Sequence, residues 1–275
     1  MTMTTLRRLW LALCVVALAG CAAGPRIDRS YTAIGQDSRV HFLIIHYTAE
    51  DSALSLKTLT QDKVSAHYLL DDGADFKIYG LVDESRRAWQ AGVSSWKGNT
   101  NLNSGSIGIE IVGLGFKDTP QGRVWYPFPT GQIDKLIPLV QGIVKRHEIP
   151  PERVLGHSDI APQRKQDPGP LFPWKRLADA GLVVWPDEQE AARRQPAFEA
   201  SLPDAAWFQK KLEDFGYAVP RTGQLDDATR NVVSAFQMKY RNTKFDGAPD
   251  AQTAALLDVL TDPPVKVASP AGVAK

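Results

Sequence analysis

The hydrophobic and polar positions of the chain follow two periods, one typical of strands and one typical of helices. A dense apolar run with β-branched residues at 40–46 predicts a buried strand. Strict alternation over 106–112 predicts a second strand, with three isoleucines on one face and Gly108 and Glu110 on the other. From Thr130 onward, apolar residues recur at three-to-four spacing and predict an amphipathic helix.

Shorter elements lie between and after these segments. The other expected strands are at 67–71, 77–82 and 153–156, and the other expected helices are at about 53–62 and 174–180. Strands interleaved with helices over 38–182 predict an α/β domain with a mixed central β-sheet flanked by helices. Residues 92–105 and the Pro-rich segment 158–173 are expected to be loops.

The last third of the chain predicts a second, smaller domain. Residues 183–202 mix charge, Ala and Pro and are expected to form a linker. A small C-terminal three-helix domain is expected over 203–262, followed by a tail at 263–275. The pattern G-x-x-D-x-x-T occurs at 223–229 and again, 24 residues later, at 247–253. Each Asp of this pattern is expected to cap a helix N-terminus.

Composition narrows the classes of protein and of partner. The chain has 275 residues, enough for roughly two domains at about 150 residues each. With 32 Lys and Arg against 31 Asp and Glu, its near-neutral charge argues against a nucleic-acid partner. Two cysteines exclude a disulfide scaffold and a four-cysteine zinc site. Any metal ion must therefore be held by His and carboxylate side chains.

The N-terminus predicts export and a lipid anchor. Two arginines precede an apolar run at 9–19, which is the arrangement of a signal peptide over 1–20 and is too short to span a bilayer. The run ends in Leu-Ala-Gly-Cys21, which resembles a bacterial lipobox and predicts acylation of Cys21; a signal peptide without lipidation is the alternative. Residues 21–37 are expected to be a tether. Resemblance to Gram-negative lipoproteins implies attachment to outer-membrane lipid, facing the periplasm.

Four polar residues interrupt or follow the predicted strands and suggest a catalytic metal site. His46 closes one strand, Glu110 interrupts another, and His157 and Asp167 frame a loop. Catalytic zinc takes three protein ligands, which His46, His157 and Asp167 would supply. Glu110 would act as a general base, and the cation Lys165 would stabilise an oxyanion. The spacing is equally compatible with a core histidine, a loop histidine and a capping aspartate.

The segments around these residues carry a family resemblance. The sequence resembles the zinc N-acetylmuramoyl-L-alanine amidases of the type 2 amidase family, which are related to peptidoglycan recognition proteins. The matching segments are LIIHYTA (43–49), VSAHYLLDDG (64–73), 87–113 and VLGHSDIAPQRKQDPGPLFPW (154–174). The resemblance implies that His46, His157 and Asp167 bind Zn²⁺ and that Glu110 and Lys165 are catalytic. One departure is Gln90, where many relatives have His, and it affects the polarity of the pocket.

The resemblance also implies a substrate and a second binding domain. The expected reaction is hydrolysis of the amide between the lactyl group of N-acetylmuramic (or anhydro-muramic) acid and L-alanine of peptidoglycan stem peptides. Tyr47, Trp89, Asn101 and Arg164 are candidates for substrate contacts. Residues 204–260 resemble a peptidoglycan-binding domain, and a helical cap that binds nothing is the alternative. For the whole chain, the alternative is a non-catalytic, lipid-anchored protein that binds peptidoglycan.

Overall fold

The computed structural model of the chain describes residues 25–262. Of these, residues 25–37 belong to one unit, and a second unit begins at Ser38 and contains every helix and strand described below. The predicted signal peptide, Cys21 and the tail at 263–275 lie outside the described residues. None of the helices within residues 25–262 has the length and apolar character needed to cross a bilayer.

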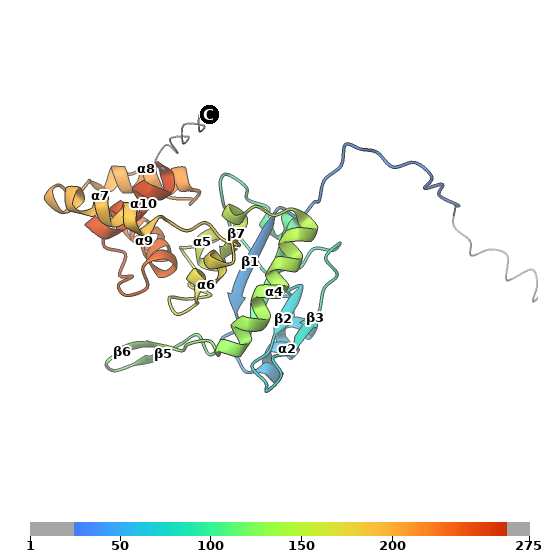
Figure 1. Ribbon diagram of the computed structural model, residues 1–275. Coiled ribbons are helices and arrows are strands. Elements are labelled where there is room, and N and C mark those ends of the chain that lie inside the picture. The colour runs from blue at the N-terminus through green and yellow to red at the C-terminus, as the bar shows by residue number, and fades with distance from the viewer. Residues whose placement is uncertain (1–24, 263–275) are drawn as a thin grey trace, which may run out of the picture. The chain divides into compact units, whose positions relative to one another are not determined.

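A five-stranded sheet forms the centre of the first domain (Figure 1). Its strand order is β3-β2-β4-β1-β7. The strands are β1 (Phe42–Tyr47), β2 (Tyr68–Leu70), β3 (Ile78–Gly80), β4 (Ser106–Ile111) and β7 (Val154–Gly156). Strands β2, β4, β1 and β7 pair in parallel, whereas β3 pairs with β2 in the antiparallel sense. The sheet is therefore mixed, which confirms the predicted fold class.

Helix α4 (Thr130–His147) covers one face of this sheet (Figure 1). Its buried residues Leu136 and Val140 belong to the same apolar cluster as Ile45 and Ile109 of the two central strands. The isoleucines of β4 thus face α4, as the alternation predicted, and this leaves Glu110 on the opposite face. The alternation of side chains along β4 therefore places the candidate catalytic residue Glu110 on the face of the sheet that α4 does not cover.

Several short elements complete the domain. They are α2 (Ser52–Gln61), α3 (Leu102–Gly105), β5 (Phe116–Thr119), β6 (Gly122–Trp125), η1 (Pro151–Arg153), α5 (His157–Ile160) and α6 (Trp174–Asp179). Strands β5 and β6 pair only with each other, as a hairpin that projects from the domain (Figure 1). Helices α3 and α5 lie where the sequence predicted loops. Helices of one turn are too short to show a hydrophobic period, so the pattern of apolar residues does not predict them.

The C-terminal domain, 203–262, has the three predicted helices, which are α8 (Ala205–Phe215), α9 (Asp227–Tyr240) and α10 (Ala251–Thr261). A further helix that the sequence did not predict, α7 (Glu188–Ala200), precedes them. The interpretation of 183–202 as a linker is wrong, because most of this stretch is α7. Asp187 caps this helix, and Arg194 forms ion pairs with Glu190 of α7 and Asp258 of α10. Helix α7 is thus held by its cap, its charges and its packing against α10.

The repeated G-x-x-D-x-x-T pattern forms two equivalent helix starts, as predicted. Asp226 accepts a hydrogen bond from the backbone N–H of Thr229, and Asp250 accepts one from that of Thr253, both at 2.8 Å. Both threonines are buried, and each hydroxyl receives a hydrogen bond from a buried glutamine side chain. The two turns are therefore fixed by the same set of polar contacts.

Candidate metal centre and active site

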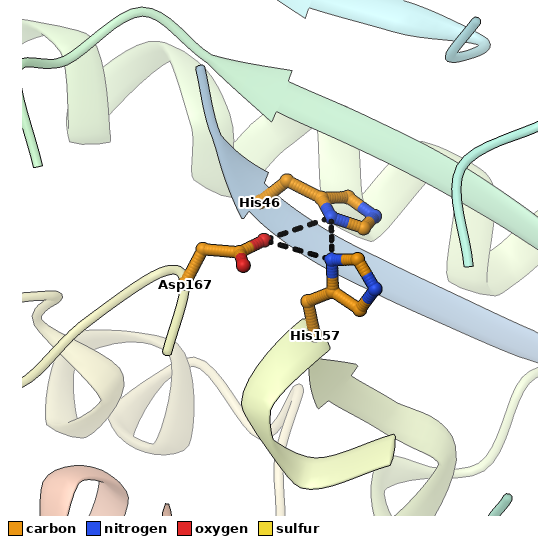
Figure 2. Close-up of side chains that lie close together, drawn as sticks. All are labelled: His46, His157 and Asp167. Atoms are coloured by element: carbon orange, nitrogen blue, oxygen red, sulfur yellow. Dashed lines mark hydrogen bonds and ion pairs between the residues drawn. The ribbon is translucent and has the colours of Figure 1, made fainter. Parts of the chain in front are cut away.

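Three side chains from distant parts of the sequence converge at the carboxyl edge of the sheet (Figure 2). His46 lies near the end of β1, and His157 begins α5 directly after β7. Because β1 and β7 are parallel neighbours, their carboxyl ends bring both imidazoles together. His46 Nδ1 lies 3.0 Å from both His157 Nδ1 and Asp167 Oδ2, and His157 Nδ1 lies 3.1 Å from Asp167 Oδ2.

Hydrogen bonds at the far side of each ring determine which nitrogen is free. His46 Nε2 donates to Gln90 Oε1 at 2.6 Å, and His157 Nε2 donates to the Ala91 carbonyl at 3.2 Å. Both Nδ1 atoms therefore present lone pairs, which is the usual arrangement of metal-binding histidines. Gln90 is oriented in turn, because its Nε2 donates to Ser106 Oγ at 2.7 Å. The residue that departs from the family pattern thus supports a candidate ligand.

The donor set fits a zinc ion. All three residues are buried, and together they offer two imidazole nitrogens and one carboxylate oxygen. Lone pairs at this separation repel unless a cation lies among them, and a set of two His and one carboxylate is typical of catalytic zinc with an open position. Burial would raise the pKa of Asp167, but His157 and His46 hold this pKa well below its ordinary value. Burial lowers the pKa of His157, which favours the neutral form that binds metals.

Glu110 is a carboxylate that lies beside this centre. It is the register partner of His46 across the β1–β4 pair. Its Oε2 atom is buried and has no hydrogen-bond partner within the described part of the chain. Burial raises the pKa of Glu110 to about 7, although the neighbouring His46 and Lys165 act to lower it. A carboxylate with a pKa close to neutral can both accept and return a proton at physiological pH.

A cavity of about 610 Å³ opens over the centre. Glu110 and Lys165 line it together with the three converging residues, and so do three of the four candidate substrate contacts, Tyr47, Trp89 and Arg164. Asn101 does not line this cavity: it precedes α3, lines a separate hollow, and accepts a hydrogen bond from Ser104 Oγ at 3.1 Å. The expectation that Asn101 touches the substrate is therefore not supported by its position.

Other residues that line this cavity were not predicted from the sequence. Arg123 of the β5–β6 hairpin stacks over the Phe116 ring at 3.6 Å and donates to Gln166 Oε1 at 2.6 Å. Asn231 of α9 donates to Gln163 Oε1 at 3.0 Å and also lines the cavity. The local sequence does not predict these contacts, because each of them forms only when a distant segment folds back onto the edge of the cavity.

Two family models and several known proteins match this chain. The family model of N-acetylmuramoyl-L-alanine amidases matches residues 36–170, and the model of a peptidoglycan binding domain matches residues 201–257. The chain is 40% identical, over 273 residues, to the N-acetylmuramoyl-L-alanine amidase AmiD of Escherichia coli (strain K12); the match covers 93% of this chain and 98% of that protein. The chain therefore belongs to the N-acetylmuramoyl-L-alanine amidase family.

Solved structures agree with this assignment. The complex of Escherichia coli AmiD with anhydro-N-acetylmuramic acid-L-Ala-D-gamma-Glu-L-Lys superposes with a TM-score of 0.77 at 40% identity, covering 86% of this chain and 94% of that chain. AmpDh3 of Pseudomonas aeruginosa superposes with a TM-score of 0.79 at 41% identity, covering 86% of this chain and 98% of that chain. The predicted fold and the predicted enzyme class, an amidase that is a hydrolase, are confirmed.

Proposed function

We propose that this protein hydrolyses the amide bond between the lactyl group of N-acetylmuramic or anhydro-muramic acid and L-alanine of the stem peptide, with Zn²⁺ held by His46, His157 and Asp167. The observation that carries the proposal is the convergence of three buried side chains that could hold a metal ion, beside Glu110, whose Oε2 has no hydrogen-bond partner within residues 25–262. The substrate is supported by relatives, since AmiD and AmpDh3 have been solved with anhydro-muramic peptides.

The residues around the centre have separate tasks in this reaction. A zinc ion with three protein ligands supplies a Lewis acid, which polarises a carbonyl and lowers the pKa of water. Glu110 takes a proton from the attacking water and passes it to the leaving nitrogen, a role that suits its raised pKa. Lys165, a fixed cation that lines the cavity, stabilises negative charge on the carbonyl oxygen.

The remaining surface of the cavity would hold the substrate. Tyr47 and Trp89 provide aromatic faces for sugar or peptide, and Trp89 is itself covered by the Arg87 guanidinium at 3.9 Å. Arg164 lines the cavity, where it could contact the substrate. Its guanidinium also donates hydrogen bonds to the carbonyls of Ala91 and Val93, which hold this part of the cavity wall in place. The C-terminal domain, 203–262, would bind intact peptidoglycan, which is supported by the match of residues 201–257 to a peptidoglycan binding domain.

Glu110→Gln tests the enzymatic proposal. The variant keeps the size of the side chain and removes the base, so release of stem peptide from a defined muropeptide should fall by about 10²- to 10⁴-fold. The zinc content, measured by atomic absorption, should remain that of the wild type. His46→Ala should lose both zinc and activity, and Glu199→Gln, on the exposed side of α7, should lose neither. Near-normal turnover by Glu110→Gln would refute the assignment of the base.

We also propose that the chain is an outer-membrane lipoprotein acylated at Cys21, facing the periplasm of a Gram-negative bacterium. The support is in the sequence: two arginines, an apolar run at 9–19 and Leu-Ala-Gly before Cys21. One acyl chain anchors a protein only marginally, whereas several hold it firmly. Labelling with a radioactive fatty acid should mark the wild type and not Cys21→Ser, and the variant should leave the outer-membrane fraction. Equal labelling of the two proteins would contradict the anchor.

A further inference from the structure

A buried aspartate close to the metal centre is held by the C-terminal domain. Asp159 lies in α5, two residues after His157, and its Oδ2 accepts hydrogen bonds from the Gly156 backbone N–H at 2.8 Å and from Lys239 Nζ at 2.7 Å. Its Oδ1 accepts a hydrogen bond from the Tyr217 hydroxyl at 2.6 Å. The side chains of Asp159 and Lys239 are only 1% and 4% exposed. Asp159 therefore receives two of its three hydrogen bonds from the other domain.

Lys239 also contacts the strand that leads to His157. Its ammonium group lies 3.5 Å from the Val154 carbonyl of β7 and 4.2 Å from the centre of the Trp174 ring. A buried ammonium is stable only where charge and hydrogen bonds compensate its lost hydration, and here that compensation comes from the metal-binding domain. The ion pair thus joins α9 to the β7–α5 turn at which His157 lies.

Tyr217 also contacts the loop that accepts a hydrogen bond from the His157 imidazole. Its ring packs against Trp96 with the ring centres 4.9 Å apart and the planes at 74°. Trp96 belongs to the loop that begins at Ala91, whose carbonyl accepts the hydrogen bond from His157 Nε2. The same loop is joined to α5 by the hydrogen bond from the Ser95 N–H to the Ile160 carbonyl at 2.8 Å. Tyr217 therefore contacts both the helix that carries His157 and the loop that orients its ring.

We propose that Lys239 and Tyr217 are positioning residues of the metal centre, so that the C-terminal domain keeps His157 in the geometry that binds zinc. This inference rests on the proposed function, because it assumes that His157 is a zinc ligand. Without Lys239, the carboxylate of Asp159 would be buried without a counter-charge, which is strongly destabilising and favours a shift of α5 that brings this carboxylate towards water. A shift of α5 moves His157 Nδ1 relative to His46 and Asp167, and supporting contacts of this kind tune metal affinity.

The test compares four variants of the full-length chain in detergent. Tyr217→Phe removes the hydroxyl that binds Asp159, and Lys239→Met removes the buried cation. The matched controls are Tyr240→Phe, whose buried hydroxyl makes only a 3.4 Å contact to a backbone carbonyl, and Lys211→Met, whose ion pair lies within the C-terminal domain. The measurements are zinc affinity by competition with a chromophoric chelator, the visible spectrum of the cobalt-substituted protein, and kcat and KM on a soluble muropeptide.

We expect Tyr217→Phe and Lys239→Met to weaken zinc binding by about threefold to tenfold, less than loss of a direct partner of a ligand. The cobalt spectrum should change, and kcat should fall with KM unchanged, while both controls match the wild type. Far-ultraviolet circular dichroism shows whether each variant is folded, and Tyr217→Phe decides the matter if Lys239→Met does not fold. Zinc affinity and a cobalt spectrum equal to those of Tyr240→Phe would overturn the proposal. If the wild-type protein binds no zinc, both the proposed metal centre and the positioning role are wrong. This outcome is distinct from the one above, in which the wild type binds zinc and the variants bind it equally well.

Discussion

Gln90 offers a direct test of how the metal centre is held. Its Oε1 accepts the hydrogen bond from His46 Nε2, and Gln90→Leu removes this acceptor while keeping a side chain of similar size. Ser106 Oγ would keep its own hydrogen bond to the Leu102 carbonyl, so the loss falls on His46. Since His46 is 1% exposed, water has little access to its orphaned N–H. The ring is then free to turn, and Nδ1 loses the direction that the candidate site requires.

The size of the effect follows from the burial of that N–H group. A buried donor without a partner costs about 1–3 kcal/mol. At about 1.4 kcal/mol for each factor of ten, this range spans roughly fivefold to 150-fold in affinity. Loss of a hydrogen-bond partner of a metal-binding histidine typically costs 10- to 100-fold, which lies within the same range. We therefore expect Gln90→Leu to weaken zinc binding by about 10- to 100-fold.

Competition with a chromophoric chelator would measure this zinc affinity, and chromatography of released peptide would follow activity. Gln90→Glu is the matched control, because its carboxylate still accepts from His46 and should retain most of the affinity. Gly108→Ala gives an independent approach, since a Cβ there would lie 2.6 Å from Gln90 Cγ and force that side chain to move. If Gln90→Leu binds zinc as tightly as Gln90→Glu, the hydrogen bond does not orient the ligand and the reasoning is wrong.

Two further predictions concern stability. Burial acts to raise the pKa of Glu84, but hydrogen bonds from Arg146, Tyr68 and His147 lower this pKa to about 2. The ionised carboxylate therefore stabilises the fold above its ordinary pKa, and this stabilisation is lost as the pH falls from about 4.5 towards 2. The melting temperature of Glu84→Gln should therefore fall less than that of the wild type over this interval, and parallel curves would contradict the role of Glu84. Leu136 is fully buried between α4 and the sheet, so Leu136→Ala should lower the free energy of unfolding in urea by about 2–5 kcal/mol. The same truncation at Leu114, which is 56% exposed, should cost far less, and equal losses would exclude a packing effect.

The sequence was most informative where a polar residue breaks an apolar pattern. His46 and Glu110 could be found this way, because a buried strand rarely tolerates a polar side chain without a reason. Pattern alone left His157 and Asp167 open to other roles, since their meeting with His46 depends on the pairing of β1 with β7. Sequence spacing does not report such a contact between residues more than a hundred positions apart. The pattern offered these residues as one of several interpretations, and the family resemblance favoured the metal site over the others.

Other features depend on tertiary contacts and leave little trace in the sequence. Helix α7 is rich in charge and contains Pro196, so its hydrophobic period is weak, and contacts with α10 stabilise it. The bond between Lys239 and Asp159 joins residues of two domains, and a lysine within an otherwise amphipathic helix is normally read as solvent-exposed. Asn101 lies in the predicted loop 92–105, yet the fold places it at a different hollow from the one that Glu110 lines.

The pairing of His46 with Glu110 has a consequence for redesigning the substrate range. The two residues occupy the same level of adjacent parallel strands, whose separation of about 4.8 Å is a property of every β-sheet. Insertions or deletions in the surrounding loops can alter what enters the cavity without changing the spacing between these two side chains. A single-residue deletion within β4 would instead turn Glu110 towards α4 and replace it with an apolar neighbour. Diversity can therefore be introduced in the loops, whereas the length of β4 must stay constant.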